Sequence, residues 1–401
     1  MKVNIEVDIN LLFHRWVHYL ANKPGNDNFL STRKQELELI KGVHSSLCTD
    51  INKYRYYLDR VILTIDSKYD SWRKFLPIKE KQSFYKEKRN KDYNFDYGKF
   101  LDLMTLYCKV MQERGIYVID VENAEGDDLC HIVSNILYER GESSIITTSD
   151  SDIRQLIKSS QEKFIFVYDS FMGKKTHYID KYIDFDVSEE DKLIVTSENI
   201  DDEFGGMFDE PAAKNEELSS AKVLNDIYDQ SEIVNPSLIA FCKMLAGDKG
   251  DNVPSVYYKP TKKGDKFTSF TELRAEGVYA KMIEKQPIDR NFFISLFHDE
   301  TLRRDIASKV LAEVNSTELV KIGDIADNIK RNLQFTLLDD IVYTPDMKKR
   351  LYDSVNQTLN DKDLLIRHKE VISGGYSFDL LKGTELETSN DTTLYHDDKR
   401  Y

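Results

Sequence analysis

The chain has 401 residues, 40% of them hydrophobic, which is enough for one large domain or two to three smaller ones with real cores. No run approaches the roughly 18 apolar residues of a membrane span, and the acid-bearing N-terminus does not resemble a signal peptide. The net charge of −14 argues at first against nucleic acid, and four scattered cysteines predict reduced thiols in a cytoplasmic setting without a zinc site.

Strands and helices alternate through the first part of the chain. Residues 3–8 (VNIEVD) alternate in polarity and predict a short strand. Residues 11–20 and 32–58 have helical spacing, and residues 60–66 (RVILTID) predict a compact apolar strand. After a basic segment, residues 95–115 again predict a helix.

The alternation continues beyond that helix. Residues 116–121 (IYVIDV) predict a strand, and residues 122–141 predict a loop that turns into a helix. Residues 143–149 predict a strand, residues 150–159 the start of the next helix, and residues 164–170 (FIFVYDS) another strand. Strand then helix, repeated four times, is typical of a parallel α/β sheet.

The second half of the chain has a different pattern. Residues 198–217 hold eight acids and one lysine, a net charge of −7, so we interpret residues 184–235 as an acidic insertion or linker. Residues 236–401 are mainly helical in pattern, with a polar tail from about residue 385. We therefore predict an α/β domain over residues 1–183, followed by a helical region.

Acidic residues follow the predicted strands at the point where each strand ends. They are Asp8, Asp66, Glu125, Asp127, Asp128, Asp150 and Asp152. Since the carboxyl ends of parallel strands share one edge of a sheet, seven carboxylates would meet in one crevice. Helix capping would account for Asp128 and Asp150 individually, because acids favour N-caps and first turns. It does not account for Asp8 and Asp66, each of which follows an apolar strand.

A cluster of this many carboxylates predicts bound cations. Unpaired carboxylates in one crevice would repel one another, and several would take up protons. Oxygen ligands without Cys or His favour Mg²⁺ or Mn²⁺, and this many acids fits two ions, the usual arrangement for attack on a phosphodiester. Asp248 and Asp251, in the run KMLAGDKGDNVPSV, complete a predicted set of nine ligands. Taken alone, that run is also explained as a loop with Asp at turn positions.

A basic segment follows Asp66 directly. Residues 68–91 hold nine basic and three acidic residues, a net charge of +6, with aromatic residues between them. Lys and Arg neutralise phosphates and aromatic rings stack on the bases of single strands, so the segment predicts nucleic-acid binding. A solvated basic helix is the alternative. The candidate contacts are Trp72, Arg73, Lys74, Lys79, Lys81, Tyr85, Lys86, Lys88 and Arg89.

These runs also resemble the motifs of a known family. VIDVENAEGDDLCHIV, IITTSDSDIRQLI and MLAGDKGDNVPSV are similar, in that order, to the three acidic motifs of the flap endonuclease and 5′ nuclease family. ILTIDSKYDSWRKFLPIKEKQSFYKEKR resembles its second acidic strand and the basic arch that follows. Within this family the runs most resemble the phage branch, in particular the ribonuclease H-type 5′ exonucleases of T-even bacteriophages. It covers roughly residues 1–180 and 236–350.

The resemblance implies a PIN-like domain with two Mg²⁺ ions, for which Mn²⁺ can substitute, followed by a helical hairpin region that grips duplex DNA. It implies hydrolysis of RNA primers in RNA–DNA hybrids and of 5′ flaps or ends of DNA during replication. A single-strand-binding protein or a polymerase clamp is then a candidate partner. By motif, the first metal would take Asp8, Asp66, Glu125, Asp127, Asp128 and Asp150, and the second would take Asp152, Asp248 and Asp251.

The arch has its own implied roles, and the chain departs from the cellular family after Asp251. Lys86 and Arg89 resemble the arch cations that contact the scissile phosphate, and Tyr85 is the base-stacking candidate. Ser255 stands where the cellular family usually has Gly, and VYYKPTKKGDKFT replaces a Gly-rich hairpin that grips phosphates. The candidate phosphate contacts there are Lys259, Lys262, Lys263 and Lys266.

Two other functions stay open. One is a catalytically silent accessory protein that binds DNA structures, against which the complete acid set argues. The other is a PIN-type ribonuclease that acts on RNA, against which the long chain and its helical second region argue.

Overall fold

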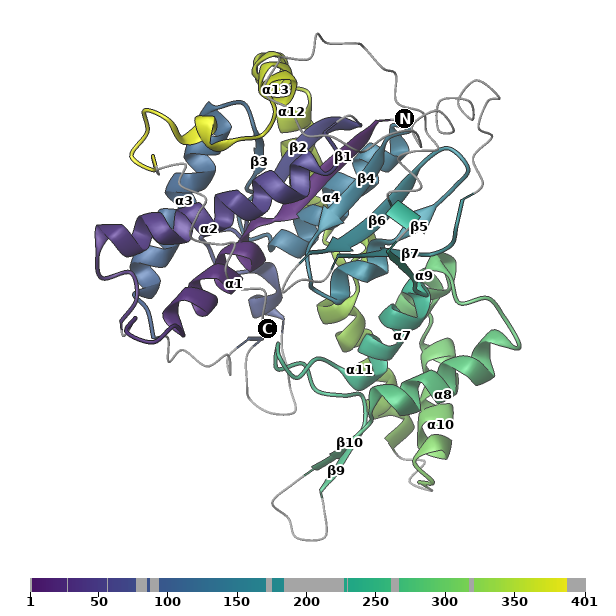
Figure 1. The fold of residues 1–401 in the computed structure, drawn as a ribbon. Helices are drawn as coiled ribbons and strands as arrows, with labels where there is room; N and C mark the ends of the chain where they lie inside the picture. Colours follow the sequence, from purple (N-terminus) through teal and green to yellow (C-terminus); the bar gives the residue numbers. More distant parts are fainter. Residues whose placement is uncertain are drawn as a thin grey trace, which may run out of the picture.

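The structure is a computed structural model of the chain (Figure 1). It describes residues 2–26, 28–55, 57–76, 85–86, 94–170, 175–183, 227–228, 230–260, 267–316 and 321–387. Within these ranges, no helix combines the length and apolar character of a membrane-spanning segment.

A mainly parallel sheet organises the N-terminal half. Its strands are β1 (Val3–Asp8), β2 (Leu58–Thr64), β3 (Tyr117–Ile119), β4 (Ser143–Thr147), β5 (Lys158–Ser159), β6 (Phe164–Asp169), β7 (Thr176–Ile179) and β8 (Ser231–Ile233). They lie in the order β3-β2-β1-β4-β6-β7-β8, with β5 paired to β6. Strands β3, β2, β1, β4 and β6 run parallel, whereas β5 and β7 are antiparallel to β6. The predicted α/β class is confirmed.

The strand order reverses between β1 and β4. The chain leaves β1 for β2 and β3 on one side and then returns to β4 and β6 on the other. The registers Asp8↔Thr64 and Val7↔Thr147 bring the carboxyl ends of β1, β2 and β4 level. In open α/β sheets, ligand crevices form outside the carboxyl ends at such a reversal. The topology therefore marks the edge near Asp8 before any side chain is considered.

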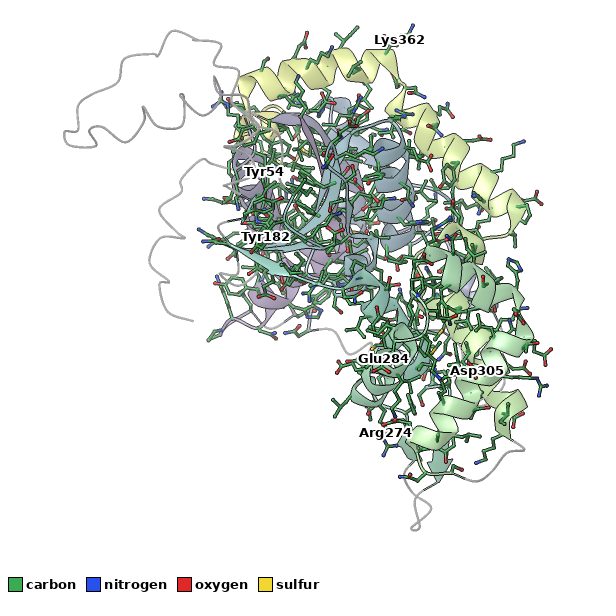
Figure 2. The ribbon with its side chains drawn as sticks, turned by 90° about the vertical axis from the view of Figure 1, so that its right-hand side faces the viewer. Tyr54, Tyr182, Arg274, Glu284, Asp305 and Lys362 are labelled. Atoms are coloured by element: carbon green, nitrogen blue, oxygen red, sulfur yellow. The ribbon has the colours of Figure 1, made fainter. Side chains whose placement is uncertain are left out.

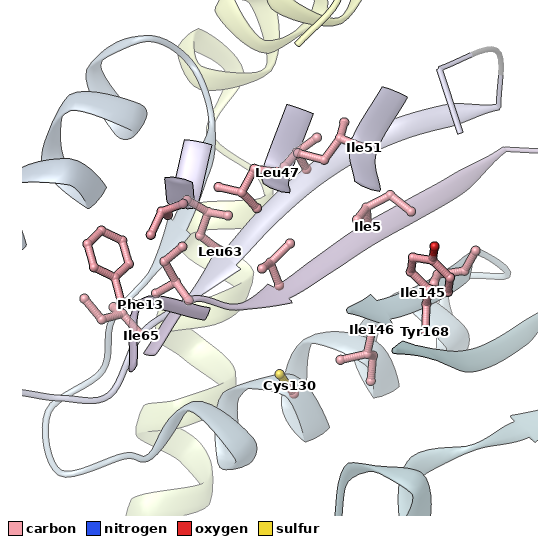
Figure 3. Close-up of a cluster of buried hydrophobic side chains, with 14 of the residues drawn as sticks. Ile5, Phe13, Leu47, Ile51, Leu63, Ile65, Cys130, Ile145, Ile146 and Tyr168 are labelled. Carbon is pink, nitrogen blue, oxygen red and sulfur yellow. The ribbon is translucent and has the colours of Figure 1, made fainter. Parts of the chain in front are cut away.

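Helices cover both faces of the sheet. They are α1 (Ile9–Ala21), α2 (Arg33–Asn52), α3 (Tyr97–Glu113) and α4 (Gly126–Glu139). Side chains alternate between the faces of a strand, so Val61 and Leu63 of β2 join one core and Ile62 joins another. The first core contains Phe13 of α1 and Leu47 of α2 (Figure 3). The second contains the apolar face of α4.

The rest of the chain is mainly helical, as its pattern predicts. It contains α7 (Pro236–Ala246), α8 (Glu272–Ile283), α9 (Arg290–His298), α10 (Glu300–Glu313), α11 (Lys321–Thr336), α12 (Pro345–Leu359), α13 (Lys362–Gly374) and the hairpin β9 (Tyr258–Pro260) and β10 (Phe267–Ser269). Short 3-10 helices are η1 (Trp72–Phe75), η2 (Asp152–Leu156), η4 (Asp340–Val342) and η5 (Phe378–Leu381). In Figure 2, Glu284 and Asp305 lie at one end of the molecule and Lys362, where α13 begins, at the other.

Three features differ from the expected arrangement. Residues 150–159 were expected to begin a helix, but they form only η2 and the short strand β5. The C-terminal segment does not stay within a separate helical region, because Tyr376, Leu381 and Leu386 belong to the first core, beside the sheet. Strand β8 also joins that sheet, next to β7.

Candidate metal centre

Two strand-end carboxylates meet at the N-terminus of α4. Asp66 Oδ1 accepts a hydrogen bond of 2.6 Å from the backbone N–H of Gly126. A β-carbon on Gly126 would lie 3.2 Å from Asp66 Oδ1 and 3.6 Å from Asp8 Oδ1, so both carboxylates reach the same helix end. Asp8 also caps α1 through the N–H of Leu11, at 3.1 Å. The N-terminus of a helix favours negative charge, which helps to hold the two acids together.

The first turn of α4 adds three more carboxylates. Oxygens of Glu125, Asp127 and Asp128 all lie within 4.8 Å of one another, a spacing that could hold a metal ion. The Asp127 side chain is 28% exposed, whereas those of Glu125 and Asp128 are 8% and 0% exposed. Asp127 is therefore the member of this group that faces outward.

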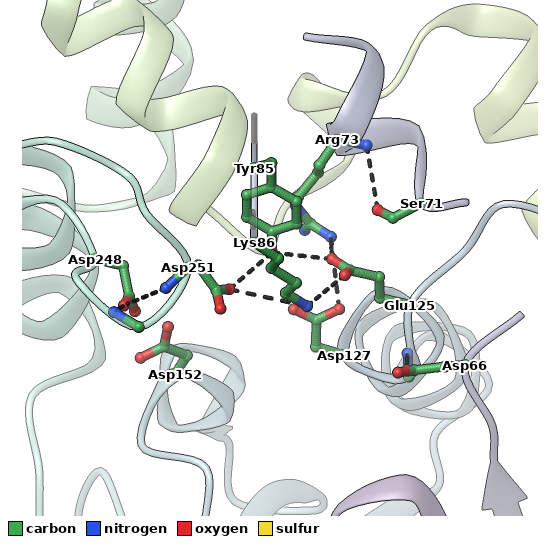
Figure 4. Close-up of polar contacts among 12 residues, drawn as sticks. Asp66, Ser71, Arg73, Tyr85, Lys86, Glu125, Asp127, Asp152, Asp248 and Asp251 are labelled. Atoms are coloured by element: carbon green, nitrogen blue, oxygen red, sulfur yellow. Dashed lines mark hydrogen bonds and ion pairs between the residues drawn. The ribbon is translucent and has the colours of Figure 1, made fainter. Parts of the chain in front are cut away.

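Glu125 is surrounded by donors from the basic segment. Its carboxylate accepts from Arg73 Nη1 at 2.7 Å and from the Tyr85 hydroxyl at 3.1 Å, and it pairs with the Lys86 ammonium (Figure 4). Burial alone would raise the pKa of Glu125, but Lys86 and Arg73 outweigh it and lower the pKa to about 2. Glu125 is therefore ionised at neutral pH.

The second acid group gathers around a lysine of α7. Lys243 Nζ lies 2.9 Å from Asp152 Oδ1 and 2.8 Å from Asp248 Oδ2. Asp248 also accepts from the backbone N–H groups of Gly250 (2.7 Å) and Asp251 (3.2 Å) within its own turn. The run GDKGDN is thus a turn stabilised by Asp248 and also a source of carboxylates. Its interpretation as a turn and its interpretation as part of the acid cluster are therefore compatible.

The two groups are joined by residues 85 and 86. The Tyr85 hydroxyl donates to Asp251 Oδ2 at 2.8 Å, and Lys86 Nζ lies 3.9 Å from the same oxygen. The backbone N–H of Lys86 donates to the carbonyl of Asp251 at 2.9 Å. Figure 4 shows Lys86 between Glu125 and Asp127 on one side and Asp251 on the other. The acids of these two groups therefore lie along one edge of the sheet.

Negative charge is in excess at this edge. Burial, together with the charges of Asp66 and Asp150, raises the pKa of Asp8 to about 7. Burial and Asp150 likewise raise the pKa of Asp152 to about 6, against the opposing effect of Lys243. Carboxylates in this state gain from a bound cation. The donors are oxygens alone, which fits a hard divalent cation.

Three predicted nucleic-acid contacts face the protein instead. The Arg73 side chain is 0% exposed, and Tyr85 is 3% exposed, with its ring stacked on Phe335 at 5.4 Å. Trp72 donates its indole N–H to Asp128 and packs against Tyr343. These three residues were expected to contact bases or phosphates. In the structure, their side chains contact other protein groups instead.

The remaining predicted contacts are only partly covered. Lys74 is exposed and pairs with Asp70. Lys259 lies in β9, and its side chain is outside the described part of the chain. Also outside the described residues are Lys79, Lys81, Lys88, Arg89, Lys262, Lys263 and Lys266.

Sequence reasoning missed three charged residues beside the cluster. Lys243, in the last turn of α7, lies five residues before Asp248, and that closeness was a usable signal. Asp169 is buried at the end of β6, where FIFVYD repeats the strand-then-acid pattern. Burial lowers the pKa of Arg15, while Asp169, Asp8 and Asp150 oppose the shift, so this α1 arginine lies near all three acids. No local pattern marked Arg15.

One family model and several solved structures are similar to this chain. Residues 5–190 match the family model of the 5′-3′ exonuclease N-terminal, resolvase-like domain. No curated protein matches the chain. A solved 5′-exonuclease of bacteriophage T5 with bound zinc is similar with a TM-score of 0.46 and 12% identity, covering 94% of this chain and 100% of that one. A T5 flap endonuclease in a pseudo-enzyme-product complex with DNA and metal ions gives a TM-score of 0.44 and 12% identity, covering 94% and 99%.

Proposed function

We propose that this chain is a metal-dependent 5′ nuclease, since residues 5–190 match the family model of the 5′-3′ exonuclease N-terminal domain. The observation that carries the proposal is the convergence of carboxylates where the strand order reverses. They come from the ends of β1, β2 and β4, from the start of α4 and from the turn at Asp248 and Asp251. An oxygen-only cluster of this kind suits hydrolysis of a phosphodiester.

Two Mg²⁺ ions, or Mn²⁺ in their place, are the proposed cofactors. Residues that would hold the first are Asp8, Asp66, Glu125, Asp127 and Asp150, and residues that would hold the second are Asp152, Asp248 and Asp251. When bound, such ions lower the pKa of a water molecule and offset charge on the phosphate. Asp128, predicted with the first group, is fully buried among protein donors.

The chain's own cations complete the site. Lys86 lies within the acid cluster, so a phosphate bound there would place its oxygens near this ammonium, where charge develops during hydrolysis. Lys243 holds Asp152 and Asp248 in one orientation. Arg89 remains a second candidate contact to the scissile phosphate.

The proposed substrates are RNA primers in RNA–DNA hybrids and the 5′ flaps or ends of DNA during replication. The basic segment that directly follows Asp66 supports a nucleic-acid substrate, because its net charge of +6 contrasts with the acidic remainder of the chain. The lysines of the β9–β10 hairpin sequence supply further positive charge. A single-strand-binding protein or a polymerase clamp is the proposed partner class.

A cleavage assay tests the proposal. End-labelled 5′-flap DNA and an RNA–DNA hybrid are incubated with Mg²⁺, Mn²⁺ or EDTA. We expect short 5′ products that disappear with EDTA, and loss of cleavage in Asp150→Ala and Asp248→Ala with duplex binding retained. Glu232→Ala is the matched control, because Glu232 is an exposed acid on the edge strand β8. Full activity in either aspartate variant would contradict the metal assignment.

Two results would favour the alternatives. Tight flap binding without products in any metal would indicate the silent accessory protein. Cleavage of single-stranded RNA alone would indicate the PIN-type ribonuclease.

A further inference from the structure

Arg73 is a fully buried cation in η1, the short helix that follows β2 and Asp66 in the chain. Its Nη1 lies 2.7 Å from Glu125 Oε2 and 3.0 Å from Asp128 Oδ2, and its Nη2 lies 2.8 Å from Asp128 Oδ1. The pair with Asp128 is therefore bidentate, the geometry in which Arg binds carboxylates most strongly. Both side chains are 0% exposed. An arginine in this position cannot contact a phosphate in solution.

Asp128 is saturated by protein donors. Oδ2 accepts from Arg73, from the Trp72 indole at 3.0 Å and from the backbone N–H of Glu125 at 3.1 Å. Oδ1 accepts from Arg73 and from the Tyr343 hydroxyl at 2.9 Å. A carboxylate offers about four lone-pair sites, and five donors already converge on this one. Asp128 has no oxygen left for a metal ion, although it belongs to the same acid cluster.

These contacts connect three parts of the fold. Trp72 and Arg73 lie on η1, at the base of the basic segment. Asp128 lies in the first turn of α4, and Tyr343 follows η4 in the C-terminal half. The guanidinium of Arg73 thus fixes the beginning of α4 relative to the segment that would meet nucleic acid.

We propose that Arg73 and Asp128 form a positioning pair that orients Glu125 and Asp127 as metal ligands, an inference that rests on the proposed function. Arg73 holds one oxygen of Glu125, and the other oxygen points to Lys86. Asp128 anchors Arg73 and also closes the capping box at Glu125, while its N–H donates to Asp127 Oδ1 at 2.7 Å. Neither member of the pair touches the metal ions or the substrate.

Direct Mn²⁺ binding, measured from the free-ion EPR signal without nucleic acid, tests the pair. Arg73→Lys keeps the charge but cannot make the bidentate contact and reach Glu125 at once. We expect its affinity for Mn²⁺ to fall about tenfold, the loss usual for residues that orient metal ligands, with the number of bound ions unchanged. Asp127→Asn removes a proposed ligand and should instead remove one ion from the binding stoichiometry.

Arg60→Lys is the matched control. Arg60 pairs with Asp59 and Glu142 near the amino end of β2, so this variant disturbs a similar partly buried pair away from the metal edge. It should bind Mn²⁺ as the unmodified chain does. Circular dichroism checks that each variant folds. If Arg73→Lys does not fold, Tyr343→Phe makes a milder test, because it removes only the hydroxyl that donates to Asp128.

The outcomes separate this inference from the proposed function. Unchanged Mn²⁺ affinity in folded Arg73→Lys would overturn the positioning pair. Loss of one ion in Asp128→Asn, to the extent seen in Asp127→Asn, would also overturn it by making Asp128 a ligand. Absence of Mn²⁺ binding in the unmodified chain would contradict the metal-dependent nuclease itself.

Discussion

At the scale of single residues, two lysines neutralise part of the acid cluster. Lys86 pairs with Glu125 and approaches Asp251, and Lys243 pairs with Asp152 and Asp248. Opposite charges within about 4–6 Å favour the ionised forms of such carboxylates, so Lys86 and Arg73 lower the pKa of Glu125. A divalent ion that entered the site would compete with these ammonium groups for the same oxygens.

Lys86→Met should therefore bind Mn²⁺ more tightly, by about tenfold at low salt, because removal of a positive charge removes its repulsion of the ion. The rate of cleavage at saturating metal should fall if Lys86 contacts the phosphate. Mn²⁺ titration and single-turnover cleavage measure the two effects separately. Lys74→Met is the control for Mn²⁺ affinity, since Lys74 is exposed and pairs with Asp70. Weaker Mn²⁺ binding in Lys86→Met would contradict the competition.

Glu6 gives a prediction about stability. It is buried in the middle of β1, and burial raises its pKa from 4.5 to about 8. Between these values the unfolded chain releases a proton that the folded chain keeps, so the free energy of unfolding falls as pH rises. Glu6→Gln stays neutral, and its stability relative to the unmodified chain should rise by about 1.4 kcal/mol per pH unit across this window. Urea unfolding at pH 4.5, 6 and 7.5 measures it, and a difference that does not change with pH would refute it.

At the scale of elements, the turn that carries Asp248 and Asp251 depends on Gly247. Gly247 has a φ of 73°, and an added β-carbon would lie 2.5 Å from the carbonyl oxygen of Val253. Asp248 and Val253 exchange both backbone hydrogen bonds across this turn, at 2.9 and 2.7 Å, so the clash cannot be relieved without breaking it. The backbone turn that positions Asp248 and Asp251 therefore requires glycine at position 247.

Gly247→Ala should lower the stability of the protein and weaken Mn²⁺ binding together. Gly141→Ala is the matched control, because Gly141 has a φ of 85° but nothing lies within 4 Å of its added β-carbon. The control should lose about 1 kcal/mol from backbone strain alone. Gly247→Ala should lower the free energy of unfolding by clearly more than this, as measured by urea unfolding. Equal losses in the two variants would show that the contact with Val253 is unimportant.

The elements were largely predictable because hydrophobic periodicity and strand-end acids are local signals. The helix predicted to begin at residues 150–159 does not form, and the reason is a tertiary contact. Lys158 and Ser159 pair antiparallel with Ile165 and Phe164 of β6, and this hairpin ends the helical turn after Leu156. Periodicity could not reveal it, since Ile153 and Leu156 are spaced as they would be in a helix.

The positions of the acids were predictable from the sequence, but the partners of their side chains were not. Asp8, Asp66, Asp150 and Asp152 lie at or just after the ends of their strands, so the sheet topology was enough to bring these four to one edge. Tyr85 packs against Phe335, and one of the five donors to Asp128 is Tyr343, a residue 215 positions away. Contacts over such sequence separations leave no local pattern, so the sequence around Tyr85 cannot show whether this aromatic ring faces solvent or a helix of the second half.

At the scale of the whole molecule, the C-terminal segment closes over the N-terminal sheet through two buried histidines. His368 of α13 accepts the backbone N–H of Val61 at 3.1 Å and lies 2.7 Å from the carbonyl of Gly115. His44 of α2 lies 3.0 Å from the carbonyl of Ser377. An accepting nitrogen must be unprotonated, so the docked state requires neutral His368. Burial lowers the pKa of both histidines to about 4.

Docking of this segment should therefore weaken in acid. Below the ordinary pKa of about 6.5, a released histidine takes up a proton that the docked one does not, so docking loses about 1.4 kcal/mol per pH unit for each histidine down to about pH 4. Hydrogen exchange of α13, corrected for the intrinsic effect of pH, measures the opening free energy. His368→Gln should roughly halve its pH dependence, whereas His298→Gln, at an exposed histidine, should leave it unchanged. Equal pH dependence in His368→Gln and the unmodified chain would show that this histidine does not control docking.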